Sequence, residues 1–348
     1  MRRWQKTERK LHYHPKEKAD YMKTCKVIAP AKVNLFLGIG KPREDGFHDV
    51  MTVMHALSMH DTLQMCLVES GEHVQIMEEN DPAQPLRQAI VKVEEGQGLQ
   101  VVVRNLWFNA IEPMDIPSED NLACKAVRNL AEELGRTQDE TIRIVIEKHI
   151  PYQAGLGGGS SDAAAAILGA ANMWGVPVED PAVDRAARRT GADVSFFIHG
   201  GCALMTDRGD CFAGSLQPRR DSVVVVKPEG GVSTGAAYRL FDEAPDYFTQ
   251  GDFDDIRAAQ HAEEVRLGNN LQKPAQKLLP IISEAVEFVR ASEGVRDVLL
   301  CGSGSAVFAP CESYEAAQAL VARASLQGYW ARATTFSGIR AAVMPARR

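Results

Sequence analysis

Apolar and polar residues alternate along several stretches of this chain, and the period of that alternation predicts which element each stretch forms. Residues 141–148 place Ile142, Ile144 and Ile146 on one face and charged residues on the other, which predicts a half-exposed strand. A turn is expected at 41–46. Other strands are predicted at 27–37, 51–56, 61–68, 99–104, 223–227, 298–301 and 306–308.

Helices are predicted where apolar residues recur every three or four positions. Residues 122–134 show this spacing, follow a run of polar capping candidates and end at Gly135. Residues 162–174 are rich in alanine, which has the highest helix propensity. Further helices are expected at 184–189, 278–291 and 314–324, and a turn followed by a strand at 191–197. This mixture of helices, strands and hairpins indicates an α+β fold.

The length of 348 residues favours two domains or one large two-lobed unit. We expect an N-terminal domain at 25–200 and a C-terminal domain at 201–345, with Gly200 and Gly201 as the hinge. Residues 69–120 are acidic and interrupted by proline and glycine, so they are expected to form loops around the strand at 99–104.

The first 24 residues carry eight Lys or Arg residues against three acidic ones, and no apolar segment follows them. This pattern argues against a secretory signal. We interpret residues 1–24 as a disordered extension, or as a start assigned too early, with Met22 as the first residue. A functional basic arm is the alternative.

Composition narrows the classes of function. The formal net charge of −7 argues against a dedicated nucleic-acid binder. The strongest apolar run, 223–226, is far too short to span a membrane. The seven cysteines are scattered and form no C-x-x-C pair, which argues against a zinc site or a disulfide framework. Reduced thiols in a cytoplasmic protein are the simpler interpretation.

A glycine-rich run lies between the strand predicted at 141–148 and the alanine-rich helix. Glycines let successive backbone N–H groups point into one concavity, and a helix start adds partial positive charge, so the run is suited to bind nucleotide phosphates. Ser160 and Ser161 can cap the helix and offer hydroxyls to phosphate or Mg²⁺. The candidate ATP-binding residues are Pro151, Ala154, Gly155, Leu156, Gly157, Gly158, Gly159, Ser160 and Ser161.

Two familiar phosphate-binding loops do not fit this run. A Walker A loop needs a lysine after its last glycine, and none follows Gly159. A dinucleotide fingerprint that begins at Gly155 needs a glycine where Ser160 stands. A tight strand–helix turn without ligand is the remaining alternative, although three consecutive glycines exceed what such a turn needs.

Three motifs in this order resemble the GHMP kinase superfamily. The first is A-P-A-K-V-N-L-F-L at 29–37 with D-G-F-H at 45–48, the second is the glycine-rich run after Pro151, and the third is L-C-G-S-G-S-A-V-F at 300–308. Shorter matches lie at 119–122, 191–194 and 231–234. The resemblance implies a two-lobed fold, with an N-terminal α/β domain like that of ribosomal protein S5 and a C-terminal α+β sandwich domain.

The pairing of P-A-K-x-N-L with D-G-[FY]-H is the most specific part of the resemblance. It implies a kinase that transfers the ATP γ-phosphate to the tertiary 2-hydroxyl of a cytidine diphosphate methylerythritol, in non-mevalonate isoprenoid synthesis. The resemblance makes Asp193 the base and Lys32 the cation that keeps Asp193 ionised and stabilises the transferring group. Mg²⁺ would arrive with ATP, with Ser161 as a candidate ligand and no dedicated protein cage.

The resemblance also implies residues that bind the substrates. Asn121 would face the adenine, Asn34 would contact the acceptor near Lys32, and Phe47 and His48 would receive the cytosine. The turn formed by Gly302, Ser303 and Gly304 would pack beside the first glycine run and meet substrate phosphate. Two positions depart from the family pattern: Phe47 replaces the commoner tyrosine, and Ser195 replaces a proline after G-A-D-V.

Simpler interpretations exist for several of these residues. Taken alone, Lys32 is an exposed strand lysine, Asp193 a turn residue before a strand, Asn121 a helix cap, and 302–304 a hairpin turn. Other functions also remain open: a GHMP kinase for homoserine, mevalonate or a sugar, or a nucleotide-binding relative without catalysis. We expect small-molecule partners alone, without nucleic acid or membrane, and a monomer or homodimer.

Overall fold

The computed structural model describes residues 22–70, 73–77, 88–109, 111, 113–114 and 116–345. The predicted extension therefore lies outside the described residues up to position 21, and its last three residues begin the first strand. The α+β prediction is confirmed, because helices cover mixed parallel and antiparallel sheets in this part of the chain.

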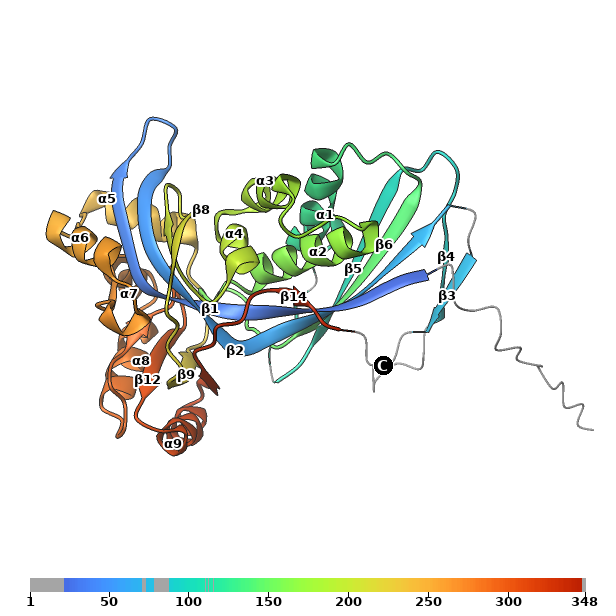
Figure 1. Cartoon of the computed structure of the whole chain (residues 1–348). Helices are drawn as coiled ribbons and strands as arrows, with labels where there is room; N and C mark the ends of the chain where they lie inside the picture. The colour runs from blue at the N-terminus through green and yellow to red at the C-terminus, as the bar shows by residue number, and fades with distance from the viewer. Residues whose placement is uncertain are drawn as a thin grey trace, which may run out of the picture.

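A large sheet forms the backbone of the molecule, and its longest strands, β1 and β2, pair as an antiparallel ribbon that runs through both halves (Figure 1). Within the described residues it has eight strands, in the order β10-β1-β2-β6-β5, with β14 beside β1 and β7–β8 beside β2. These strands are β1 (Met22–Pro42), β2 (His48–Glu69), β5 (Leu99–Trp107), β6 (Glu140–Lys148), β7 (Cys202–Thr206), β8 (Cys211–Leu216), β10 (Gly268–Asn269) and β14 (Ala342–Val343).

Four helices cover one face of this sheet: α1 (Leu122–Glu133), α2 (Gly158–Trp174), α3 (Pro181–Thr190) and α4 (Ala192–His199). The alanines of α2 are almost completely buried, because α2 packs against the other three helices and against β1. Close packing also explains Gly169, where a Cβ would stand 2.2 Å from the Met65 sulfur. The small side chains of α2 thus let the helix pack close to β1 and β2.

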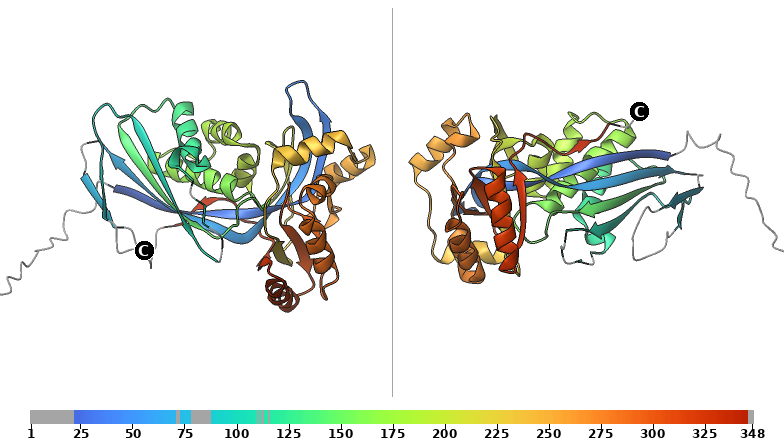
Figure 2. Two further views of the ribbon diagram at one scale, coloured as in Figure 1. Left: turned by 180° about the vertical axis from the view of Figure 1, so that it is seen from behind. Right: turned by 90° about the horizontal axis from the view of Figure 1, so that it is seen from below.

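A second sheet, in the order β11-β12-β9-β13, packs against the first at one end of the molecule (Figure 2). The run 223–226 lies in its β9 strand, with Val223 and Val225 facing the large sheet and Val224 and Val226 facing α8 and α9. Both faces of β9 are covered, which explains an unbroken apolar run. The elements are β9 (Ser222–Lys227), β11 (Leu299–Leu300), β12 (Val307–Cys311), β13 (Trp330–Thr335), α8 (Ile281–Arg290) and α9 (Tyr314–Leu326).

Three further helices follow β9 and precede β11 along the chain. They are α5 (Thr234–Glu243), α6 (Gln250–Ala258) and α7 (Gln272–Leu278). A small hairpin, β3 (His73–Met77) with β4 (Gln88–Lys92), lies in the segment expected to hold loops around one strand. Short 3₁₀ turns span Ser118–Asp120 and Ala262–Glu264. Among the described residues, no helix is both long and apolar enough to cross a bilayer.

Three element predictions were wrong. The strands at 51–56 and 61–68 are one strand, β2, because it pairs with β1 almost throughout, with a bulge opposite Pro30 to Lys32. Residues 192–199 form helix α4 rather than a strand, because burial of Phe196 and Phe197 beneath α2 and α3 outweighs their β propensity. The helix at 278–291 begins at Ile281, since Pro280 separates it from α7.

The division at residue 200 stays a prediction. Gly200 and Gly201 both have positive φ angles, as a sharp change of chain direction requires. However, β7 and β8, which follow them, continue the large sheet by pairing with β2.

Candidate active site

The glycine-rich run connects β6 to α2, and two of its glycines have backbone angles that other residues rarely adopt. Gly155 and Gly157 have φ angles of 75° and 70°, a region that favours glycine. Helix α2 begins at Gly158 with Gly157 as its cap, so the predicted capping by Ser160 and Ser161 was wrong. Both serines lie in the first turn instead. The N–H groups of Gly158, Gly159 and Ser160 precede the first intrahelical bond, which Ser161 N donates to the Gly157 carbonyl at 2.8 Å, so these three remain available to an anion.

The C-terminal glycine turn at 302–304 docks directly against this run, as predicted. Ser305 N donates to the carbonyl of Gln153 at 3.1 Å and Ala306 N donates to that of Ala154 at 3.3 Å. The side chain of Asn269 in β10 donates to the carbonyl of Gly302 at 2.7 Å and fixes the turn from the other side. The two glycine motifs therefore form one continuous surface.

Lys32 lies beneath that surface and is only 3% exposed, so its interpretation as an exposed strand lysine was wrong. Its Nζ lies 3.3 Å from Oδ2 of Asp193 and donates to Oδ1 of Asn34 at 2.8 Å. The Lys32 backbone N–H donates to the carbonyl of Leu156, which joins β1 to the glycine-rich run. Thr52 in turn accepts from Nδ2 of Asn34 at 2.8 Å and holds that amide in place.

Asp193 stands in the first turn of α4, not before a strand. A carboxylate at this end of a helix is favoured by the partial positive charge of the free N–H groups. The ammonium of Lys32 adds a full positive charge beside it. The side chain of Asp193 is 35% exposed, so the carboxylate is accessible from the cavity.

Two cavities flank the glycine-rich run. The loop cavity, about 470 Å³, is lined by residues 150–160 with Asn105, Trp107, Asn121 and Lys148. The lysine cavity, about 410 Å³, contains Lys32, Asn34, Asp193 and the turn at 302–304. Gly155, Gly157 and Ser160 line both cavities, as does Thr234, whose hydroxyl bonds that of Ser303 at 2.8 Å. Two ligands can therefore meet across the glycine-rich run.

Phe47 and His48 lie at the tip of the β1–β2 ribbon, outside the residues that line the lysine cavity. Phe47 is 53% exposed. His48 is buried, with its Nε2 2.8 Å from Oδ1 of Asp242 in α5. Its ring lies 5.1 Å from that of Tyr238, which does line the cavity. The predicted pair thus lies one residue away from the cavity, because Tyr238 and Arg208 line it and contact His48 and Phe47 respectively.

Asn121 caps α1, because its side-chain oxygen accepts from Ala123 N at 2.9 Å. The interpretation of Asn121 as a helix cap is therefore correct. The same residue also lines the loop cavity, so a contact with a base in that cavity stays a prediction.

Comparison with known proteins identifies the family to which this chain belongs. Residues 121–201 match the model described as GHMP kinases N terminal domain, and residues 246–329 match GHMP kinases C terminal. The 4-diphosphocytidyl-2-C-methyl-D-erythritol kinase of Desulfitobacterium hafniense is 31% identical over 85% of this chain and 90% of its own length. That of Nocardia farcinica is 33% identical over 90% of this chain and 93% of its own. The chain belongs to this kinase family within the GHMP kinases.

A solved structure agrees with that assignment. The crystal structure of a 4-(cytidine 5'-diphospho)-2C-methyl-D-erythritol kinase is 29% identical, with a TM-score of 0.65 over 90% of this chain and all of that one. The two-lobed GHMP kinase fold expected from the sequence is therefore confirmed. As a GHMP kinase, the protein uses ATP as the phosphoryl donor.

The structure of this GHMP kinase also reveals a buried ion cluster that the sequence did not suggest. Lys148, at the end of β6, donates to both Asp61 and Asp162, and the bond to Asp162 is 2.5 Å. Asp61 also accepts from the backbone N–H groups of His149 and Ile150. Burial lowers the pKa of Lys148, but the two carboxylates outweigh burial and raise it. Burial raises the pKa of Asp162 to about 8.

This cluster holds both ends of the glycine-rich run, because it joins the end of β6 to the start of α2. Lys148 Nζ lies 3.5 Å from where a Cβ of Gly158 would be, directly beneath the helix start. Asp61 comes from β2 and Asp162 from α2, so the three side chains tie the sheet to the helix. Asp162 directly follows the glycine-rich run and lies 14 residues after Lys148, whereas Asp61 lies 87 residues before Lys148. The contact with so distant a residue explains why pattern reasoning missed the cluster.

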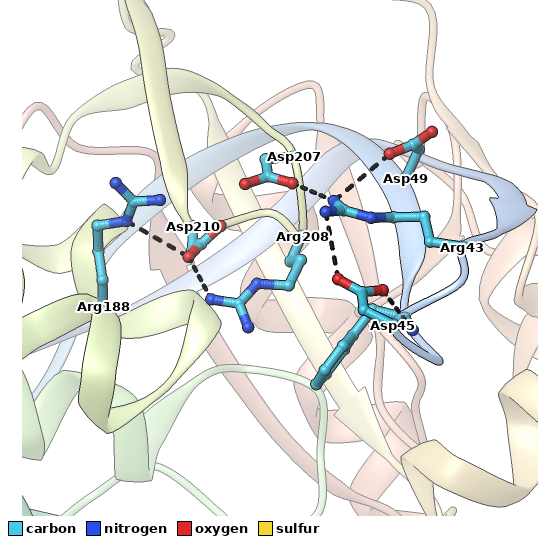
Figure 3. A network of polar contacts seen from close by, with 8 residues as sticks. Arg43, Asp45, Asp49, Arg188, Asp207, Arg208 and Asp210 are labelled. Carbon is cyan, nitrogen blue, oxygen red and sulfur yellow. Dashed lines mark hydrogen bonds and ion pairs between the residues drawn. The ribbon is translucent and has the colours of Figure 1, made fainter.

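Three donor atoms from Asp207, Asp210 and Cys211 lie within 4.8 Å of one another in the β7–β8 turn. Arginines already bind both carboxylates: Arg43 pairs with Asp207, and Arg188 and Arg208 pair with Asp210 (Figure 3). The positive charge of these three guanidinium groups opposes a metal cation at this position.

Proposed function

We propose that this chain transfers the γ-phosphoryl group of ATP to the 2-hydroxyl of 4-diphosphocytidyl-2-C-methyl-D-erythritol and produces the 2-phosphate for non-mevalonate isoprenoid synthesis. The observation that carries the chemistry is the contact of 3.3 Å between Lys32 and Asp193, in a cavity that shares the glycine-rich run with a second cavity. The names of the relatives support the choice of acceptor.

In this proposal the acceptor occupies the lysine cavity, with its 2-hydroxyl beside Asp193. The Asp193 carboxylate accepts the hydroxyl proton while the hydroxyl oxygen forms a bond to the γ-phosphorus, and the bond from that phosphorus to the bridging β–γ oxygen breaks, releasing ADP. Lys32 places a positive charge beside the Asp193 carboxylate and stabilises negative charge on the transferring group. Positioning and charge neutralisation dominate phosphoryl transfer, which suits a weakly nucleophilic tertiary alcohol.

ATP occupies the loop cavity, with its phosphates on the first turn of α2. The free N–H groups of that turn and the glycines of the run provide donors. The hydroxyl oxygen of Ser161 and one carboxylate oxygen of Asp162 are buried without a partner among the described residues. Both are hard oxygen ligands of the type that Mg²⁺ prefers, so they fit a magnesium ion held with the phosphates. Such an ion neutralises phosphate charge when bound.

The cytosine binds at the rim, where Phe47 offers an exposed face for stacking. Tyr238 offers a second aromatic surface beside His48. The bond from His48 to Asp242 orients the imidazole, so its other nitrogen is available to the base edge. Homoserine and mevalonate carry no base and would leave these groups unused.

We also place the enzyme in the cytoplasm, as a monomer or homodimer. All seven cysteines are free, which is the usual state of thiols in a reducing compartment.

The experiment that tests this function is ADP release with three acceptors in parallel: the cytidine diphosphate methylerythritol, homoserine and mevalonate. We expect turnover on the first and background rates on the other two. Turnover on homoserine or mevalonate, with none on the cytidine compound, would overturn the assignment. Release of no ADP with any acceptor, combined with retained ATP binding, would instead favour a nucleotide-binding relative without catalysis.

A further inference from the structure

Arg208, in the turn between β7 and β8, lines the lysine cavity together with Lys32 and Asp193. Among the lining residues that the structure describes, these three carry the formal charges. Lys32 and Asp193 face each other at 3.3 Å and balance one another. Arg208 is therefore the cation of this cavity that no lining carboxylate neutralises.

The partner of Arg208 lies outside the cavity and is shared. Its Nη2 donates to Oδ2 of Asp210 at 2.9 Å, and Nε of Arg188 donates to the same oxygen at 3.4 Å (Figure 3). Asp210 is fully buried; burial alone would raise its pKa, but the two guanidinium groups outweigh burial and lower it. Two cations therefore share one carboxylate, which leaves this group of three with a net charge of +1.

The backbone that carries Arg208 is held in place from the neighbouring hairpin. Arg43, in the β1–β2 turn, bonds the Asp207 carboxylate, and Val50 N donates to the Asp207 carbonyl at 2.6 Å. Arg43 also pairs with Asp45 and Asp49, and none of these three acids lines the cavity. These three acids therefore pair with Arg43 and not with Arg208. The contacts of Asp207 hold the backbone next to Arg208 in place without a ligand.

Arg208 stands between the two ends of the acceptor site. Its Cζ lies 5.1 Å from the centre of the Phe47 ring, where the base is expected, and its side chain shares the cavity with Asp193, where the hydroxyl reacts. The diphosphate of a nucleotide acceptor joins these two ends and must pass Arg208. A guanidinium binds phosphate oxygens with charge-assisted, often bidentate hydrogen bonds.

Building on the proposed function, we propose that Arg208 binds the diphosphate of the acceptor and makes the site selective for a nucleoside diphosphate over the free nucleoside. Within the described residues, the guanidinium of Arg208 makes one hydrogen bond, from Nη2 to Asp210, so its other N–H groups can reach the ligand. The role is one of binding and specificity, since Lys32 and Asp193 lie at the reacting end.

The test compares the binding of CDP and of cytidine by titration calorimetry, for the wild type and for Arg208→Met, Arg208→Lys and Arg188→Met. We expect Arg208→Met to weaken CDP binding by about 10–100-fold, as loss of a charged hydrogen bond predicts, and to change cytidine binding less than about twofold. Arg208→Lys should lie between. Arg188→Met leaves Arg208 in place but removes the second cation on Asp210, so it should weaken CDP binding less than Arg208→Met does.

In turnover assays, Arg208→Met should raise KM for the cytidine diphosphate substrate and leave kcat within about threefold, since the lost contact is equally present in ground and transition states. Equal loss of CDP and cytidine binding would show that Arg208 only supports the Phe47 ring, and overturns the inference. So would unchanged CDP binding. A wild-type protein that binds neither ligand overturns the proposed function itself, and the inference with it.

Discussion

Gly155 stands so close to Cys301 that a Cβ on Gly155 would lie 1.7 Å from the Cys301 carbonyl oxygen. The two residues come from glycine motifs far apart in sequence, and the backbones meet with no room for a side chain between them. A φ of 75° at Gly155 adds a second reason for glycine. Contact between the two motifs is therefore a property of the backbone itself.

Gly155→Ala should destabilise the protein by about 2–4 kcal/mol, from overpacking together with an unfavourable backbone conformation. Urea unfolding measures the change. Gly159→Ala is the matched control, because its Cβ would meet Leu122 at an ordinary 3.5 Å. It lies in the first turn of α2, where alanine changes stability by less than about 1 kcal/mol. Equal stability of the two variants would contradict the tight contact.

Asp193→Asn should lower kcat by about 10²–10⁴-fold, because the amide keeps the shape of the carboxylate but cannot accept the hydroxyl proton. ATP affinity should persist, since Asp193 lines the lysine cavity and not the loop cavity. Single-turnover kinetics and nucleotide titration separate the two effects. A wild-type kcat in this variant would reduce Asp193 to a positioning residue.

The sequence predicted the site better than it predicted the surrounding fold. Lys32 and Asp193 came from motifs, and the structure brings them within 3.3 Å of each other. The glycine-rich run could be recognised in the sequence because consecutive glycines are rare within helices and strands. Short motifs carry this information because substrate contacts depend on particular residue types at close spacing.

What pattern reasoning missed depends on contacts between distant segments. The charged face predicted for residues 141–148 includes Arg143, yet Arg143 is only 8% exposed, so this part of β6 is not half-exposed as predicted. Residues 192–199 became a helix through burial of Phe196 and Phe197. Lys148, Tyr238 and Arg208 gain their roles from neighbours on other elements, which no local periodicity encodes.

Lys148→Met should destabilise the protein by about 3–5 kcal/mol, because it leaves the buried carboxylates of Asp61 and Asp162 without their cation. Lys23→Met is a suitable control, since Lys23 pairs with Glu69 at 3.4 Å on the exposed surface. Loss of such a surface pair costs about 1 kcal/mol or less. Denaturant unfolding of both variants gives the comparison, and a similar small loss in each would contradict a structural role for the cluster.

Phe47→Ala should raise KM for the cytidine substrate about 5–100-fold, the range expected for loss of one base–aromatic stack. Stability should change little, since the ring is 53% exposed. Phe212→Ala provides the control, because this ring is also partly exposed, at 41%, but stacks on His199 away from both cavities. An unchanged KM in Phe47→Ala would place the base elsewhere.

His55 links the stability of the large sheet to pH. Its ring is fully buried, its Nδ1 donates to the Ala56 carbonyl at 2.9 Å, and its Nε2 accepts from Arg219 N at 2.9 Å. A second proton on the ring would break the Arg219 bond and place a charge in the core. Burial, with a smaller effect of the Arg219 charge, lowers the pKa of His55 to about 4.

The unfolded chain binds a proton at this residue below about pH 6.5, whereas the native protein does not until about pH 4. Stability from His55 is therefore fully present above pH 6.5 and falls between these values, by about 3 kcal/mol in total. His55→Gln removes the titration, so its free energy of unfolding should decline less than that of the wild type from pH 7 to pH 4. Urea unfolding across this range measures both curves; because other groups titrate equally in the two proteins, parallel curves would show that His55 is not held neutral.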